Sequence, residues 1–150
     1  MIESRHDSVI VRRLSRGLIP LVQIFALYIL FFGQYGPGGG FVGGVMLGTS
    51  LILGILVFGP TDPLTVMTER IAEADGVGLM IFAAVGGLCL IGGGQFLNYA
   101  ELEVPGLAAP GRRYLGIVLT QIGVAVDIAV TAVSIVFSLS VMSGNGDSHG

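Results

Sequence analysis

The chain has 150 residues, of which 53% are hydrophobic and only 11% are charged, and its mean hydropathy is +0.87. Soluble globular proteins carry about 25% charged residues, so this composition excludes an ordinary soluble domain. The formal charge of −3 gives no support for nucleic-acid binding, which needs a basic face, and the single cysteine excludes a disulfide framework. Four long apolar runs predict an all-α integral membrane protein with four transmembrane helices and a glycine-rich turn between helices 1 and 2.

The first apolar run predicts a transmembrane helix over residues 14–32, after a polar N-terminal segment over residues 1–13. A secretory signal would have a shorter apolar core and a small-residue cleavage site, and this run contains no Ala-x-Ala sequence. The helix is therefore expected to remain uncleaved. Arg12, Arg13 and Arg16 are expected to anchor its end at the membrane surface.

Gly33 to Gly44 reads GQYGPGGGFVGG and separates the first two apolar runs. Pro37 fixes its own φ and disfavours helical geometry at Gly36, and the glycines from Gly38 onward permit positive φ. A phosphate-binding loop would need a preceding strand and, in a P-loop, a Lys followed by Ser or Thr. Because the chain contains no lysine, the stretch is interpreted as a tight turn at one membrane face.

The second transmembrane helix is predicted over residues 41–58 and begins with glycines at regular spacing. Gly40, Gly44 and Gly48 stand four residues apart, and Gly39 and Gly43 form a parallel pair. Such rows let another backbone approach closely in lipid, although glycine is also generally frequent in membrane helices. The residues predicted to form the turn and the packing surface are Pro37, Gly38, Gly39, Gly40, Phe41, Gly43, Gly44 and Gly48.

The remaining elements follow a connection that contains Pro60 and Pro63. Apolar residues at helical spacing predict a short interfacial helix over residues 64–74, with an ordinary polar loop as the alternative. The third span is predicted over residues 78–97 and the fourth over residues 114–142, so that the membrane domain covers residues 14–142 and a polar tail covers 143–150. A span of about 20 residues crosses a hydrocarbon core of about 30 Å.

The arginines predict the orientation of these four spans. Four spans place both termini and the middle connection on one side, which then holds five arginines against two on the other side. The positive-inside rule therefore predicts cytoplasmic termini in a multi-pass protein of the plasma membrane.

Asp127 is the one ionisable residue deep in an apolar run. It lies about 13 residues into the last span, near the middle of the membrane, where an aspartate costs roughly 2.5–3.5 kcal/mol on insertion scales. Its neighbours at helical spacing form a small or polar stripe, Thr120, Gly123, Asp127, Thr131, Ser134 and Ser138. Two interpretations stay open: Asp127 is a proton or cation site on a polar path that also includes Gln121, or it is a buried packing residue bonded to hydroxyls and amides.

The sequence contains no arrangement typical of an enzyme. We find no Ser-His-Asp or Cys-His set, no paired catalytic carboxylates and no cluster of metal or haem ligands. The prediction is a non-enzymatic protein without a cofactor or a bound metal.

The Gly33–Gly44 stretch, which closes the first span and opens the second, resembles the MnhB/MrpB family of small subunits of Mrp-type multisubunit Na+/H+ antiporters. The family's Pro-Gly-Gly-Gly-Phe-x-Gly-Gly core matches Pro37 to Gly44, and Ile122-Gly123-Val124 lies in the last span as in the family. Two positions depart from the pattern: many members carry His where this chain has Gln34, and Asp where it has Gln121.

The resemblance implies an accessory subunit of a Na+ (or other cation)/H+ antiporter complex. Its expected partners are the other membrane subunits and the lipid bilayer, and Na+ and H+ are the expected transported ions. One alternative is a related subunit of a membrane-bound hydrogenase or another ion-pumping redox complex. The other is a self-sufficient small homo-oligomeric transporter. In the favoured interpretation, Asp127 and the hydroxyl residues of its stripe line a hydrated boundary with a partner subunit.

Overall fold

The computed structural model describes residues 7–33, 35–59, 66, 68, 70, 76–101, 106 and 108–145. Over these residues it is built of helices without strands: α1 (Asp7–Phe32), α2 (Gly40–Phe58), α4 (Val77–Ile91), a short 3-10 helix η1 (Tyr99–Glu101) and α5 (Ala109–Asn145). The predicted all-α membrane fold, with a glycine-rich turn between the first two helices, is confirmed.

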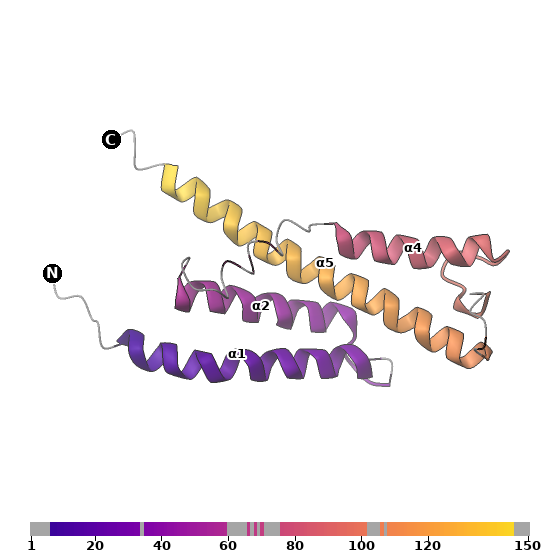
Figure 1. The fold of residues 1–150 in the computed structure, drawn as a ribbon, viewed down its shortest axis with the longest axis horizontal. Helices are drawn as coiled ribbons and strands as arrows, with labels where there is room; N and C mark the ends of the chain where they lie inside the picture. Colours follow the sequence, from indigo (N-terminus) through magenta and orange to yellow (C-terminus); the bar gives the residue numbers. More distant parts are fainter. Residues whose placement is uncertain are drawn as a thin grey trace.

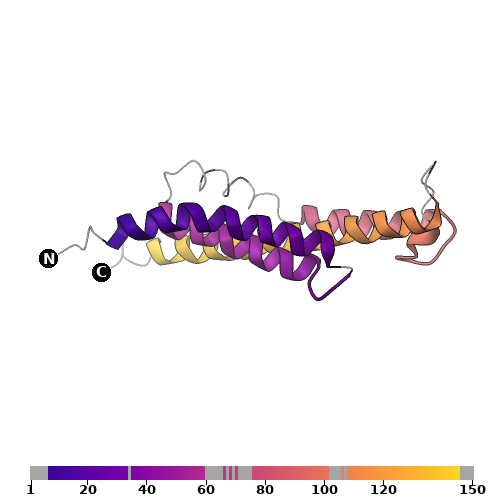
Figure 2. The same cartoon turned by 90° about the horizontal axis from the view of Figure 1, so that it is seen from below.

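α5 is the helix on which the others are arranged (Figure 1). Its 37 residues extend for about 55 Å at 1.5 Å per residue. α2 and α4 pack against it, η1 contacts its first half, and α1 packs mainly on α2. Figure 2 shows that the α1–α2 pair lies along one half of α5 and α4 along the other half. The helices are therefore staggered along α5 and do not form a closed bundle.

Three described helices are long and apolar enough to cross a membrane, over Val9–Phe32, Gly40–Phe58 and Ala109–Leu139. The fourth apolar helix, α4, has 15 residues, about 22 Å, and is shorter than a full hydrocarbon core. The predicted span continued to residue 97, whereas the helix ends at Ile91. Gly92, Gly93 and Gly94 follow at once, and Gly93 has a positive φ of 81°, which a right-handed helix does not accommodate.

The helices at both ends of the chain are longer than the predicted spans. α1 begins at Asp7 because the arginine-containing segment before the apolar run joins the same helix. α5 begins at Ala109, which places Pro110 in the first turn, where its missing N–H would have no intrahelical partner. The predicted interfacial helix over 64–74 lies mostly outside the described residues; within it, Val66, Thr68 and Arg70 are helical. Of the predicted tail, residues 143–145 belong to α5 and the rest lies outside the described residues.

Glycines on one face of α2 bring it directly against α5. A Cβ built on Gly44 would lie 2.8 Å from the Ala125 Cα, and one built on Gly48 would lie 3.2 Å from the Ala129 Cα. One built on Gly40 would lie 2.9 Å from the Gln121 Cα. Each step of four residues along the glycine row thus matches a step of four along α5, and the two helices run parallel in this register. Gly43, on another face, meets α1 instead, with its built Cβ 3.2 Å from the Ala26 carbonyl oxygen.

Candidate functional site

The polar stripe of α5 begins at Thr120, which is buried beneath η1. Its Oγ lies 3.0 Å from the Tyr99 hydroxyl oxygen. Thr120 is only 6% exposed and donates its proton to the carbonyl oxygens of Gly116 and Ile117 in its own helix. Since a threonine hydroxyl has one proton, the Tyr99 hydroxyl is the donor in the bond between the two side chains. Thr120 is therefore fully engaged in holding η1 on α5.

Asp127 lies where α4 begins. A Cβ built on Gly78 would be 2.6 Å from the Asp127 Cβ, and one built on Gly123 would be 2.9 Å from the Gly78 carbonyl oxygen. The two helices therefore cross with backbone against backbone at Gly78, Gly123 and Asp127. Such an approach is possible because two of the three residues have no side chain.

The first turn of α4 is an electrostatically favourable neighbour for a carboxylate. Its N-cap is Gly76, which provides no side-chain cap, and the turn contains no acidic residue. The first intrahelical bond is donated by the Met80 N–H to the Gly76 carbonyl, 2.9 Å away. The preceding N–H groups give this end a partial positive charge, which stabilises a nearby anion. Asp127 is half-buried, and the base of its side chain lies against this turn.

The rest of the stripe continues along α5 past the start of α4. Thr131 is exposed and Ser134 is half-buried. Ser138 is exposed and donates a hydrogen bond of 2.9 Å to the Ser134 carbonyl. The stripe therefore passes from a buried end at Thr120 to a more accessible end at Ser138, with Asp127 between them.

Gln121 lies on a different side of α5, against the glycine turn. Its Oε1 is 3.4 Å from a Cβ built on Gly39, whose φ is +96°. A pocket of about 210 Å³ lies beside this contact. Its lining residues are Gly38, Gly39, Gly40, Phe41, Thr120, Gln121 and Val124. Gly39 is also the N-cap of α2 and provides no side-chain cap. Gln121 thus stands beside the start of α2, as Asp127 stands beside the start of α4.

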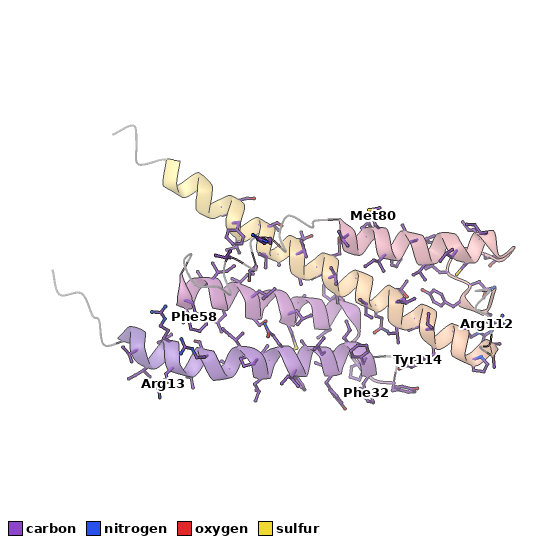
Figure 3. All side chains as sticks on the ribbon, viewed as in Figure 1. Arg13, Phe32, Phe58, Met80, Arg112 and Tyr114 are labelled. Atoms are coloured by element: carbon purple, nitrogen blue, oxygen red, sulfur yellow. The ribbon has the colours of Figure 1, made fainter. Side chains whose placement is uncertain are left out.

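A second pocket, of about 490 Å³, lies at the same end of the molecule, between the glycine turn and the first turns of α5. Tyr35 of the turn and Pro110, Arg113 and Tyr114 of α5 contribute to its lining. Figure 3 shows Tyr114 and Arg112 on the first turns of α5 and Phe32 at the end of α1. This pocket does not include any of the predicted site residues.

The structure brings only some of the predicted path residues together. Thr120 and Gln121 line one pocket, and the Thr120 hydroxyl is hydrogen-bonded to Tyr99. Asp127 lies against the start of a different helix from Gln121. Two contact residues were not predicted: Tyr99 as the partner of Thr120, and Gly78 as the residue against Asp127. Both residues could have been noticed from their positions in the sequence. Gly78 begins the third apolar run, and Tyr99 follows just after the end of that run. In the part of the chain that the structure describes, no three His, Cys, Asp or Glu side chains gather as metal ligands do.

Comparison with known proteins gives a consistent result. A family model described as a domain related to the MnhB subunit of Na+/H+ antiporter matches residues 10–142. The chain is 30% identical over 135 residues to a Na(+)/H(+) antiporter subunit of Alkalihalophilus pseudofirmus, covering 85% of this chain and 93% of that protein. It is 25% identical over 138 residues to the protein of the same name in Bacillus subtilis, covering 87% and 96%. A putative antiporter subunit mnhB2 of Staphylococcus epidermidis is 22% identical over 136 residues, covering 91% and 96%.

Proposed function

Since this chain belongs to the MnhB family, we propose that it is an accessory membrane subunit of a multisubunit cation/H+ antiporter. The observation that carries the proposal is the family match over residues 10–142, together with relatives named as antiporter subunits that it matches along almost their whole length. Those names favour an antiporter over the ion-pumping redox complex and over the self-sufficient transporter. The chain is accordingly a transporter component rather than an enzyme.

The exposed surface of the helices supports a role inside a larger assembly. Within the chain, only 22%, 33% and 28% of the residues are buried in the most apolar windows of α1, α2 and α5. The staggered arrangement leaves much of each span to be covered by lipid and by other membrane subunits. Helices associate in lipid through close packing of small residues. The glycine rows of α2 already pack against α5 and α1 of the same chain. We infer that its partners contact the outer apolar faces and the stripe of α5.

Asp127 and the hydroxyl residues beyond it form the proposed functional part of that boundary. Ionisable residues within a membrane usually face protein or water and take part in ion or proton pathways. Asp127 is half-buried beside the positive end of α4, and the exposed Thr131 and Ser138 extend the polar surface from it. We propose that this surface lines a hydrated path for Na+ or H+ between this chain and a partner. The proposed setting is the plasma membrane, with both termini in the cytoplasm.

Two measurements test the proposal. Purification of the tagged chain from its native membrane should recover the other antiporter subunits, identified by mass spectrometry. Recovery of iron-sulfur subunits in their place, or of this chain alone in an active form, would contradict the antiporter assignment.

The second measurement is antiport in everted membrane vesicles with the variant Asp127→Asn. We expect the complex to assemble and to lose most of its cation-dependent proton movement, while Asp127→Glu keeps a larger part because it retains a carboxylate. Glu101→Gln, the same acid-to-amide change outside the spans, is the matched control and should transport normally. If assembled Asp127→Asn kept full antiport at every pH tested, Asp127 would have no role in the ion pathway.

A further inference from the structure

A group of three arginines lies where α1 begins and α2 ends. Arg12, Arg13 and Arg16 account for three of the seven basic residues in the chain. They follow one another on the first turns of the span Val9–Phe32, and Phe58 is the last residue of the span Gly40–Phe58. Figure 3 shows Arg13 near the start of α1 and Phe58 at the neighbouring end of α2. The group is therefore at one membrane face.

Phe58 holds two of these arginines in place. The guanidinium carbons of Arg12 and Arg16 each lie 5.8 Å from the centroid of its ring. Arg12 also donates a hydrogen bond from Nη2 to the Phe58 carbonyl oxygen, 3.3 Å away, at the negative end of α2. The ring is buried, so the two arginines lie over a packed aromatic side chain. Arg12, Arg13 and Arg16 are all exposed.

The three arginines and Val9 line a pocket of about 180 Å³. Guanidinium groups bind phosphate and carboxylate through paired N–H donors, so three of them around one hollow form a site for an oxyanion. Within residues 1–16, four arginines stand against two acidic residues, Glu3 and Asp7. The N-terminal segment that contributes the pocket therefore has a net positive charge.

From this arrangement we infer that the pocket of Arg12, Arg13 and Arg16 binds the phosphate of an anionic phospholipid headgroup. A lipid is favoured over a soluble phosphate because apolar side chains of the same helical segment are exposed. Val9 is 62% exposed and Leu14 69% exposed, so acyl chains can lie beside the helix while the phosphate enters the pocket. Basic residues next to a span attract anionic lipids in this way. The inference depends neither on the transported ion nor on which leaflet contains the site.

The test uses the full chain with its accompanying subunits in nanodiscs of phosphatidylcholine. A trace of spin-labelled phosphatidylglycerol reports the fraction of lipid held by the protein, and spin-labelled phosphatidylcholine gives the baseline. We expect the anionic label to be held more strongly than the zwitterionic one. Arg13→Gln should weaken that preference about fivefold, the factor expected for removing one basic residue near an anionic lipid. Arg113→Gln, at the other end of the molecule, is the matched control for a basic residue beside a span without this pocket, and it should weaken the preference less than Arg13→Gln does.

A conservative variant separates binding from folding. Arg13→Lys keeps the charge without the paired donors, so it should fall between the native chain and Arg13→Gln, and the subunits recovered with each variant report assembly. Equal binding of both labels, or an unchanged preference in Arg13→Gln, would overturn the inference. Release of phosphatidylglycerol by millimolar inorganic phosphate at constant ionic strength would also overturn it, because the site would then belong to a soluble anion. Since the readout is lipid binding, loss of antiport has no influence on the result.

Discussion

Gly78 of α4 lies so close to Asp127 of α5 that a Cβ on residue 78 would be 2.6 Å from the aspartate Cβ. The carboxylate deep in the last span is thus placed by the crossing of two helices whose contact residues are far apart in the sequence. The same contact brings Asp127 to the uncapped start of α4, where the helix dipole favours negative charge. The close packing at Gly78 therefore also determines where Asp127 lies relative to the positive end of α4.

The variant Gly78→Ala tests this crossing. The added methyl group has to push against the Asp127 backbone and side chain, so α4 and α5 should separate at a cost of about 1–3 kcal/mol, typical of overpacking. The measurement is the thermal denaturation of the purified complex. Gly87→Ala is the matched control in the same helix, because a Cβ there would meet nothing within 4 Å. Equal melting temperatures for the two variants would show that the close approach is not maintained in the membrane.

A second prediction concerns the seam between the parallel helices α2 and α5, where Gly40, Gly44 and Gly48 lie against Gln121, Ala125 and Ala129. A Cβ on Gly44 would lie 2.7 Å from the Ala125 carbonyl oxygen, a backbone atom that cannot move aside cheaply. We expect Gly44→Ala to lower the stability of the complex by about 1–3 kcal/mol. Gly17→Ala in α1, where a Cβ would meet nothing within 4 Å, should change it by less than about 0.5 kcal/mol. Resistance to unfolding by SDS measures the stability of both variants. A larger loss in Gly17→Ala than in Gly44→Ala would contradict the close packing of α2 on α5.

The sequence predicted that the glycine row forms one face of α2, but it could not predict which helix packs against that face. Spacing by four defines a stripe on one helix and contains no information about its neighbour. In the structure the neighbour is α5, where Gln121, Ala125 and Ala129 repeat with the same spacing. That matching row on α5 was a signal present in the sequence. The helical class, the glycine turn and the membrane setting followed directly from composition and apolar runs.

The surroundings of Asp127 and Thr120 were less predictable because they depend on chain segments outside α5. Helical spacing correctly places both residues on α5 but says nothing about Gly78 or Tyr99, which come from the preceding helix and loop. The early end of α4 has a similar cause. A run of glycines fits either a tightly packed helix or a turn, and the positive φ of Gly93 shows that it forms a turn here.

A third prediction concerns the bond between Tyr99 and Thr120. Tyr99→Phe removes the donor, and because interhelical hydrogen bonds in membranes contribute about 0.6 kcal/mol on average, the loss should be of that order. Combining it with Thr120→Val in a double-mutant cycle should give a coupling energy of similar size. Tyr28→Phe is the control, since the exposed Tyr28 ring stacks on Phe32 at 4.9 Å between centroids. Zero coupling would mean that the two hydroxyls do not form a bond in the assembled protein.

The last prediction concerns the fastening of α1 to the end of α2. The Phe58 ring lies against both Arg12 and Arg16, and each cation–π contact contributes about 0.5–1 kcal/mol at an exposed site. Phe58→Leu keeps an apolar side chain but removes both contacts, so the ends of the two helices should separate more readily. Thermal denaturation of the purified complex measures the loss, which should be about 1–2 kcal/mol for the two contacts together. Phe31→Leu, a change of the same kind at an exposed position of α1, is the control and should melt with the native complex. If Phe58→Leu also melts with the native complex, the arginines do not depend on the ring for their position, and the hydrogen bond from Arg12 to the Phe58 carbonyl is sufficient to hold the helix ends together.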